Sequence, residues 1–391
     1  MRFKLSAILM LTIVLSACSD NNGSTALPGG VAVATIAPDY SSSSHAVVSL
    51  VNEELIVSSN LLPIESSDIT MAAGGSYFYR IERAFSGNNI TKFSFETPQD
   101  VIWQYSLRDD PEELVAANPV DMVVVNETKA YVIRRGKNVV WIVNPSAETE
   151  EEFKIGELDL SAYADSDGKP EMHKALIAGG KLFIVMQRLV NNDPSETAYV
   201  AVFDIATDME IETSYPGDSV KGIPLQIKNP QSDMVYVNTD NSIYIAAVGS
   251  YLPTVYTGGI EKIDVNTYDT SVVLDDGTAE DHPYDKITAV AVVSPTLGYF
   301  ISCADCDVTL YPDPSFTDYS LFKFNPGTGV ASAIEIIGLQ NSVLAGLALS
   351  PSGELWISAG DATLYVMETS TDSLVDTLDV FLNPNQVVFE R

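Results

Sequence analysis

Short apolar runs alternate with polar turns along most of the chain. Residues 203–208, 263–267 and 324–329 are typical, because in each an apolar run enters a turn of Asp, Asn, Pro, Thr or Gly and a second apolar run follows. This is the pattern of antiparallel strands joined by tight hairpin turns. The pattern predicts an all-β protein.

The same strand and turn recur as a long internal repeat. The turns fall near residues 52, 106, 144, 204, 264, 325 and 368, so the spacing varies from 38 to 61 residues. One unit of about 40 residues with insertions explains this spacing, and that is the length of a four-stranded propeller blade. Six units open with two clear strands, at 69–73 and 77–83, 122–126 and 131–134, 174–178 and 182–187, 225–228 and 235–238, 289–293 and 299–302, and 346–349 and 355–358.

The seventh unit is divided between the two ends of the chain. Residues 31–58 supply three strands that lack a first one, and residues 385–390 form a first strand with nothing after it. Pairing the two ends would remove the open sheet edges of a linear array. We therefore predict a seven-bladed β-propeller of four-stranded antiparallel blades, in one domain over residues 31–391. A pair of β-sandwiches and a ring of six or eight blades are the alternatives.

The repeated turn, an apolar residue followed by Asp-x-x-Thr, resembles that of the YVTN and YncE-type seven-bladed propellers. The resemblance covers nearly all of residues 31–391, although no unit preserves a YVTN sequence. It therefore supports the fold better than a function. Lipid-anchored proteins of this kind include surface proteins that capture corrinoids beside an outer-membrane transporter, which makes a membrane protein or transporter one partner to consider.

The N-terminus has the form of a lipoprotein signal peptide. Arg2 and Lys4 precede an apolar run over residues 5–14 that is too short to span a bilayer. Residues 15–18, Leu-Ser-Ala-Cys, resemble a lipobox, which implies cleavage after residue 17 and acylation of Cys18, palmitate included. Residues 18–30 then form a flexible tether of roughly 40 Å at most. Ser19, in place of Asp, favours the outer membrane, on either its periplasmic or its cell-surface side.

Charge and cysteine content narrow the choice of partners. The chain has 53 acidic and 21 basic residues and a net charge of −32, which argues against nucleic acid. Cys303 and Cys306 are expected to form a disulfide, the default for such a pair in an exported protein. Haem attachment would need His at position 307, where Asp stands.

Three consecutive units carry long insertions between their second and third strands. These insertions are residues 187–198, 246–259 and 303–318, and the connections 159–173, 214–224 and 275–286 are also long. In a propeller both kinds of loop emerge on one face, so we expect a raised sector on one rim. Loops on a rigid scaffold commonly carry binding residues.

Aromatic and basic side chains on this face are the candidates for ligand or partner binding. The aromatic candidates are Tyr251, Tyr256, Tyr284, Tyr311, Phe316 and Tyr319, and packing of the insertions is the alternative role for each. The basic candidates, from the first two complete blades, are Arg83, Arg134, Arg135 and Lys137.

Two groups of residues could hold a metal ion. Asp165, Asp167 and Glu171 resemble part of a calcium loop, with an ordinary Asp-Gly turn as the alternative. Asp68, Asp121, His173 and Asn385 precede first strands and could ring the channel mouth, as in propellers that act as metal-dependent lactonases. Such residues are also common in turns.

The expected function is binding rather than catalysis. The chain has three histidines, His45, His173 and His282, and it contains neither a G-x-S-x-G nor an H-E-x-x-H motif. No catalytic residue is therefore assigned. We expect an outer-membrane-anchored propeller that captures a ligand or docks on a membrane protein through the loop-rich face, without a required cofactor. A metal-dependent hydrolase or lactonase and a structural envelope scaffold are the alternatives.

Overall fold

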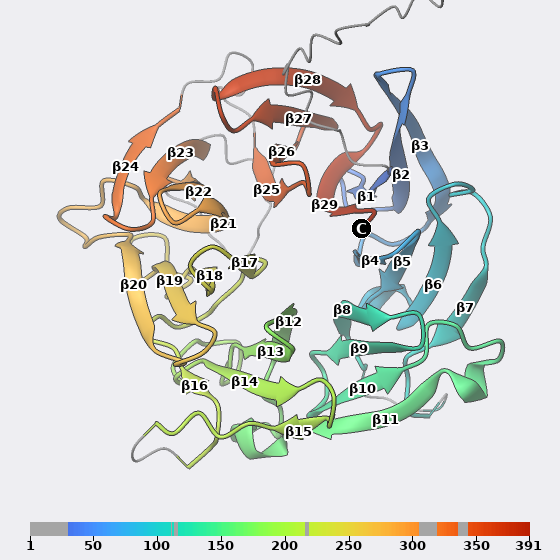
Figure 1. Cartoon of the computed structure of the whole chain (residues 1–391), viewed down its shortest axis with the longest axis horizontal. Coiled ribbons are helices and arrows are strands. Elements are labelled where there is room, and N and C mark those ends of the chain that lie inside the picture. Colours follow the sequence, from blue (N-terminus) through green and yellow to red (C-terminus); the bar gives the residue numbers. More distant parts are fainter. Residues whose placement is uncertain (1–29, 111, 113–115, 216–218, 305–318, 335–342) are drawn as a thin grey trace, which may run out of the picture.

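The computed structural model describes residues 30–110, 112, 116–215, 219–304, 319–334 and 343–391. Seven β-sheets surround a central channel, so the predicted seven-bladed propeller is confirmed (Figure 1). We number the blades in chain order. Over the described ranges, no helix has both the length and the apolar character needed to cross a membrane.

The first three blades contain the following strands, in order from the channel outwards. Blade 1 consists of β29 (Asn383–Phe389), β1 (Gly30–Ile36), β2 (Ser43–Val51) and β3 (Glu54–Ile64). Blade 2 consists of β4 (Ile69–Gly74), β5 (Tyr77–Glu82), β6 (Asn89–Ser94) and β7 (Trp103–Ser106). Blade 3 consists of β8 (Pro119–Asn126), β9 (Lys129–Arg134), β10 (Val139–Val143) and β11 (Lys154–Asp159).

The other four blades follow the same plan. Blade 4 consists of β12 (Met172–Ala178), β13 (Lys181–Met186), β14 (Tyr199–Asp204) and β15 (Met209–Glu210), with β16 (Ile223–Pro224) also paired to β14. Blade 5 consists of β17 (Val235–Val237), β18 (Ser242–Ala247), β19 (Gly259–Asp264) and β20 (Thr270–Asp275). Blade 6 consists of β21 (Lys286–Ser294), β22 (Leu297–Cys303), β23 (Tyr319–Asn325) and β24 (Val330–Ala333). Blade 7 consists of β25 (Leu344–Leu349), β26 (Glu354–Ala359), β27 (Thr363–Glu368) and β28 (Ser373–Asp379). Three short 3₁₀ turns are η1 (Ala84–Ser86), η2 (Glu150–Glu152) and η3 (Ser161–Tyr163).

The two ends of the chain close the ring, as predicted. β29 lies innermost in blade 1 and pairs antiparallel with β1, from Val31 opposite Phe389 to Ile36 opposite Asn383. The side-chain oxygen of Gln386, on β29, accepts hydrogen bonds from the Thr70 hydroxyl and from the Met71 N–H at 3.0 Å. The last strand therefore joins blade 1 to itself and also to blade 2.

One predicted strand is wrong. Residues 225–228 were expected to be a first strand and residues 235–238 a second, but β17 is the innermost strand of blade 5 and β18 the second. The apolar alternation that suggested a strand is real, since Leu225 and Ile227 are buried while Gln226 and Lys228 are exposed. These side chains pack a connection against the blade without a strand partner.

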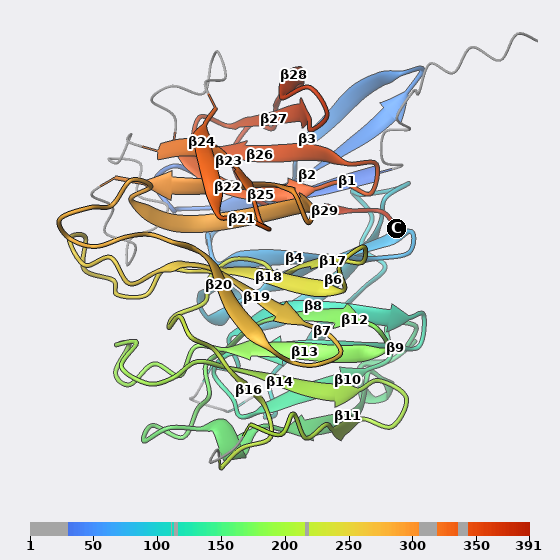
Figure 2. The same cartoon turned by 60° about the vertical axis from the view of Figure 1, so that its left-hand side comes forward.

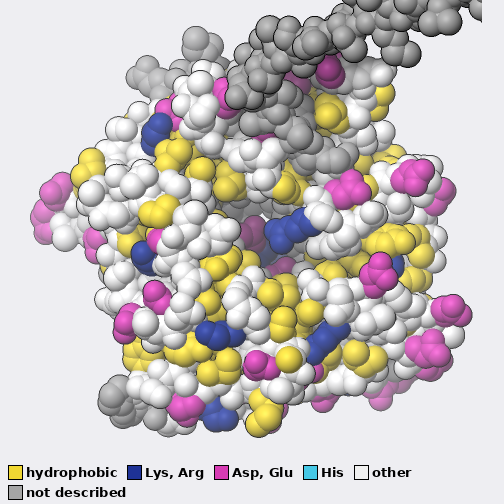
Figure 3. Space-filling model, viewed as in Figure 1, with side chains coloured by type: hydrophobic (Ala, Val, Ile, Leu, Met, Phe, Trp, Pro, Cys, Tyr) yellow, Lys and Arg dark blue, Asp and Glu magenta, His cyan; other side chains and the backbone are white. Residues whose placement is uncertain are grey.

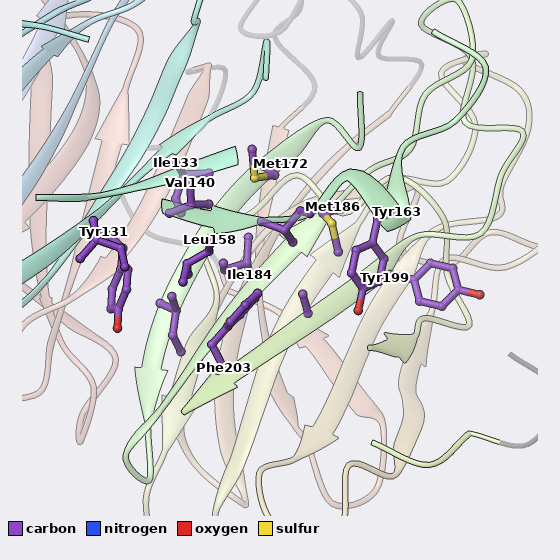
Figure 4. Close-up of a cluster of buried hydrophobic side chains, with 14 of the residues drawn as sticks. Tyr131, Ile133, Val140, Leu158, Tyr163, Met172, Ile184, Met186, Tyr199 and Phe203 are labelled. Atoms are coloured by element: carbon purple, nitrogen blue, oxygen red, sulfur yellow. The ribbon is translucent and has the colours of Figure 1, made fainter. Parts of the chain in front are cut away.

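The hydrophobic core lies between the blades. The described residues contain seven clusters of buried apolar side chains, one at each junction of neighbouring blades. At the junction of blades 3 and 4, Tyr131, Ile133 and Val140 face Ile184, Met186 and Phe203 (Figure 4). Each blade therefore has a neighbouring blade packed against each of its two faces.

The recurring Asp turn is an N–H cap between the third and fourth strands. Asp204 Oδ1 accepts hydrogen bonds from the N–H groups of Ala206 and Thr207 at 3.0 and 2.9 Å, and from the Thr207 hydroxyl. Asp264 caps its turn in the same way, and Asn325 Oδ1 accepts one such bond at 2.9 Å. This local bonding explains why Asp or Asn begins the turn. The Thr three residues later supplies a hydroxyl that also binds within the turn, to Asp204 from Thr207 and to Asp269 from Thr267.

A second recurring contact joins each of several turns to the preceding blade. In blade 3, Lys129 Nζ and the Tyr131 hydroxyl both reach the Asp208 carboxylate of blade 4, at 2.8 and 2.5 Å. In blade 6, Lys323 and Tyr299 bind Asp372 of blade 7, each at 2.6 Å. Lysine binds a backbone carbonyl in the same setting in two further blades, through Lys92 to Pro145 and Lys181 to Val265. We call this contact the inter-blade clasp.

The clasp predicts a measurable contribution to stability. Asp208→Asn removes the carboxylate that binds Lys129 and Tyr131, so we expect the free energy of unfolding to fall by about 1–2 kcal/mol. Denaturant unfolding measures the change, with Glu96→Gln, an exposed carboxyl on blade 2, as the control. Equal denaturant midpoints for Asp208→Asn and Glu96→Gln would show that the inter-blade clasp does not contribute to the free energy of unfolding.

Candidate functional site

The raised sector lies where the sequence predicted it, at one rim of the ring. The second-to-third-strand loops of blades 4 and 5, residues 187–198 and 248–258, extend from the same side as the connections 160–171 and 276–285 (Figure 2). The C-terminus lies on the opposite side. The corresponding loop of blade 6 is mostly residues 305–318, which lie outside the described residues.

A buried lysine holds the blade 5 loop in place. Lys286 is fully buried, and its ammonium group donates to the carbonyls of Ser250 and Val255 at 2.9 and 2.7 Å. Asp276 is also fully buried nearby, and burial raises the pKa of its carboxyl group to about 6. The loop that carries Tyr251 is therefore attached to the scaffold from beneath.

A cavity of about 370 Å³ opens into the central channel on this side. Its volume is in the range of small-molecule sites in proteins. We call it the channel-mouth pocket. Its polar lining consists of Thr70, Arg83, Arg135, His173, Lys174, Gln187, Gln231, Ser232, Asp233, Tyr251, Thr288, Ser358, Asn385 and Gln386.

A hydrogen-bonded frame from three blades forms one wall of this pocket. Arg135, directly after β9, donates from Nη1 to Gln187 Oε1, directly after β13. Gln187 Nε2 in turn donates to Asn229 Oδ1 at 2.7 Å, and Asn229 Nδ2 donates to the Gly249 carbonyl at 3.1 Å. Gln187 is 1% exposed and Asn229 fully buried, so both amides are fixed by their partners.

The frame continues to the blade 5 loop and to β12. The Tyr251 hydroxyl lies 3.3 Å from Asn229 Oδ1, and Gln231 Nε2 donates to the Tyr251 oxygen at 3.2 Å. His173 Nε2 lies 2.8 Å from the Gln231 carbonyl oxygen. Burial, and then the charges of Arg135 and Lys174, lower the pKa of His173 to about 3. His173 is therefore a neutral donor to that carbonyl.

An ion pair lies at the inner end of the pocket. Lys174 Nζ is 2.7 Å from Asp233 Oδ1. Burial lowers the pKa of Lys174, but the carboxylates of Asp233 and Asp121 outweigh it and raise the pKa above its ordinary value. Lys174 and Asp233 also line a second cavity, of about 1080 Å³, which is bordered by the first-to-second-strand turns on the opposite side. The pair therefore lies where the two cavities meet.

The face opposite the raised sector, on which the C-terminus lies, has a hollow at its centre where the channel opens (Figure 3). Asp and Glu side chains are spread over this face, mainly towards its outer margin, as expected for a chain with a net charge of −32. This hollow is therefore the other end of the channel from the channel-mouth pocket.

Of the predicted basic residues, Arg83 and Arg135 line the pocket, whereas Arg134 does not. Arg134 is fully buried, donates to Asp109 at 3.0 Å and lies 4.3 Å from the centre of the Trp141 ring. The expectation that Arg134 forms part of the binding surface is therefore corrected, because its charge is already paired beneath the rim. Lys137 lies on the other oxygen of Asp109, at 3.4 Å.

The predicted tyrosines divide between the pocket and the scaffold. Tyr251 lines the pocket, while Tyr256 stacks on His282 with ring centres 4.1 Å apart. Tyr284 packs edge-on against the Phe300 and Phe322 rings, and Tyr319 is only 6% exposed in the junction of blades 6 and 7. Packing explains Tyr284 and Tyr319. Tyr311 and Phe316 lie outside the described residues.

The predicted ring of Asp68, Asp121 and His173 is not brought together. Asp68 pairs with Arg83 at 3.2 Å and accepts the Phe85 N–H. The two carboxylate oxygens of Asp121 accept the Met122 and Ala175 N–H groups, each at 2.9 Å. Asp68 and Asp121 thus bind backbone N–H groups, while His173 and Asn385 line the pocket.

The other predicted metal group does come together. One ligand atom from each of Asp165, Asp167 and Glu171 lies within 4.8 Å of the others, which is the single such group among the described residues. Asp165 Oδ1 accepts the Asp167 N–H, and Glu171 Oε2 accepts the Leu189 N–H, each at 2.9 Å. Oxygen ligands of this kind suit Ca²⁺, which stays a prediction.

The cysteine predictions fall largely outside the described residues, where both Cys18 and Cys306 lie. Cys303 is disulfide-bonded. Its partner is beyond the described ranges, so the pairing with Cys306 stays a prediction, as does acylation of Cys18.

Sequence reasoning missed the amides that organise the pocket. Gln187, Asn229 and Gln231 were not singled out, although Gln187 ends an apolar run at the position where Arg135 ends another. For Gln187, a polar residue at the end of a second strand was the available signal, whereas Asn229 and Gln231 lie in the connection before β17. No protein-family model and no curated protein matches this chain.

The carboxyl group of Glu171 predicts a pH dependence of stability. Burial raises the pKa of Glu171 from 4.5 to about 7. The hydrogen bond from the Leu189 N–H opposes this shift, and the negative charges of Asp167 and Asp165 add to it. Between these values the folded chain keeps a proton that the unfolded chain has lost. The extra proton stabilises the folded state fully below about pH 4.5, and this stabilisation is lost as the pH rises through 7. It contributes on the order of 3 kcal/mol to the free energy of unfolding.

Glu171→Gln should remove this component, so the variant should gain stability relative to the parent between pH 5 and 8. Denaturant unfolding in a chelator measures the difference at each pH. Glu196→Gln, an exposed carboxyl in the neighbouring loop, is the control and should follow the parent. Parallel profiles for Glu171→Gln and the parent would contradict the prediction.

Proposed function

We propose that this chain is a membrane-tethered binding protein that holds a small molecule in the channel-mouth pocket. The observation that carries the proposal is the frame of Gln187, Asn229 and Gln231, which orients side chains from three blades around one cavity. The hydrogen bonds of this frame join side chains and are not needed to pair the strands. It fixes the direction of donors at the cavity before a ligand arrives, which lowers the entropy lost on binding.

Binding is favoured over catalysis by the state of the titratable groups. His173 is neutral and engaged with a carbonyl, Lys174 is paired with Asp233, and Asp121 is bound to two backbone N–H groups. Each group is held in a single protonation and hydrogen-bonding state. This is the behaviour of a recognition site rather than of an acid and base that exchange protons.

A pocket-filling substitution tests the proposal. Thr288 lies on β21 and lines the pocket, so Thr288→Phe should fill part of it, whereas Thr377→Phe, on the exposed outer strand β28, should not. A panel of small carboxylates, phosphates, sugars and amino acids is screened by thermal shift against residues 19–391. We expect compounds that stabilise the parent and Thr377→Phe but leave Thr288→Phe unaffected.

Equal stabilisation of Thr288→Phe, or the lack of any stabilising compound in the panel, would contradict binding in this pocket. Circular dichroism checks that each variant is folded. If Thr288→Phe is not folded, Thr288→Leu provides a smaller obstruction at the same position.

The same proposal includes attachment to the outer membrane through acylated Cys18 and kinship with the YVTN and YncE-type propellers. The lipobox-like residues 15–18 support the first, and the seven four-stranded blades support the second. Cys18→Ala should release the full chain from the membrane fraction and abolish incorporation of labelled palmitate. Retention of the variant in that fraction would mean that another segment supplies the anchor.

A further inference from the structure

The channel-mouth pocket concentrates positive charge within a strongly acidic chain. The protein has 53 acidic and 21 basic residues. Yet the charged lining of the pocket consists of three cations, Arg83, Arg135 and Lys174, and a single carboxylate, Asp233. A random sample of this chain would have the opposite sign, so the cationic lining requires an explanation.

The three cations differ in whether their charge is already neutralised. Lys174 is paired with Asp233 at 2.7 Å, and Arg83 with Asp68 at 3.2 Å. Among the described residues, no carboxylate lies within ion-pair distance of Arg135. Of the three cations, Arg135 is therefore the one without a described carboxylate in contact, and Glu171 acts on its charge only from beyond ion-pair distance.

The guanidinium of Arg135 is also held in position. One nitrogen, Nη1, is bound by Gln187 Oε1, a neutral acceptor that leaves the charge in place. Gln187 is itself fixed by Asn229. A half-buried, unpaired guanidinium is unfavourable unless an anion completes it, and its planar set of donors matches the two oxygens of a carboxylate or phosphate.

We infer that the ligand of the channel-mouth pocket is a small molecule with a carboxylate or phosphate group, and that Arg135 binds this group. The inference rests on the proposed function and adds the chemical class of the ligand. The cavity of about 370 Å³ limits the ligand to a small acid rather than a polymer. Arg83 and Lys174 contribute a favourable field, while their own carboxylate partners keep them from forming the main contact.

Titration of simple anions tests the inference. Acetate, inorganic phosphate and the neutral analogue acetamide are added to residues 19–391 at constant ionic strength, with chloride as the balancing salt. Isothermal titration calorimetry and thermal shift measure binding. We expect saturable binding of acetate or phosphate, no binding of acetamide, and a stronger response to whichever anion carries the natural group.

Substitutions at Arg135 separate a specific contact from a general effect of charge. Arg135→Gln should weaken anion binding at least tenfold, and Arg135→Lys should restore part of it, because lysine keeps the charge but loses the planar fork. Arg108→Gln removes a positive charge outside the pocket and should bind as the parent does. Should Arg135→Gln fail to fold, the comparison of Arg135→Lys with the parent still distinguishes fork from point charge.

Anion binding that is equal in Arg135→Gln and the parent, or only a non-saturating response to salt, would overturn the inference. The proposed function has a separate outcome. If neutral compounds bind and Thr288→Phe blocks them while anions do not bind, the pocket is a binding site and only the assignment of an anionic ligand fails.

Discussion

Packing between neighbouring blades is the interaction on which the whole structure depends. A middle strand such as β13 sends Leu182, Ile184 and Met186 to one junction and Phe183 and Val185 to the other. Neither face of the sheet can meet water without exposing a row of large apolar side chains. A single blade is therefore not a stable unit, and only a complete ring buries both faces of every blade. The inter-blade clasps then fix the polar margins of the same junctions.

The candidate site is a product of this rigid ring rather than of any one loop. Arg135, Gln187 and Tyr251 occupy the ends of second strands or the loops just beyond them in three successive blades. Because the strands are held by their junctions, side chains at their ends converge on the channel with little freedom. The polar network can therefore keep an arginine unpaired, at a cost in free energy that the surrounding core offsets.

The fold could be predicted from the sequence because the repeat is local and its chemistry is simple. Asp204 and Asp264 must accept N–H groups in the turn that follows, so the signal survives in several units even where the strands diverge, although residue 106 lies in β7 and not in such a turn. Residues 225–228 were wrongly predicted to be a strand because alternating burial shows only that one side of a segment faces the core. A connection without a strand partner can have the same alternation.

The site could be predicted only in part. Its face was located from the lengths of the loops, and Arg135 and Tyr251 were named. The buried state of Arg134 depends on Asp109 and Trp141, whose approach is a matter of tertiary structure. The role of Asn229 likewise depends on side chains from other blades. Neighbouring positions such as Arg134 and Arg135 are alike in sequence, and alternation of side chains along a strand sends them to different environments.

The position of β29 sets an order of events for a chain made from its N-terminus. Residues 383–389 leave the ribosome after the other strands of the ring, and until they arrive the inner edge of β1 has no partner. A nascent chain can collapse blade by blade, but its ring stays open by one strand. Arrival of β29 is therefore the step that joins the two ends of the ring and commits the molecule to its native state.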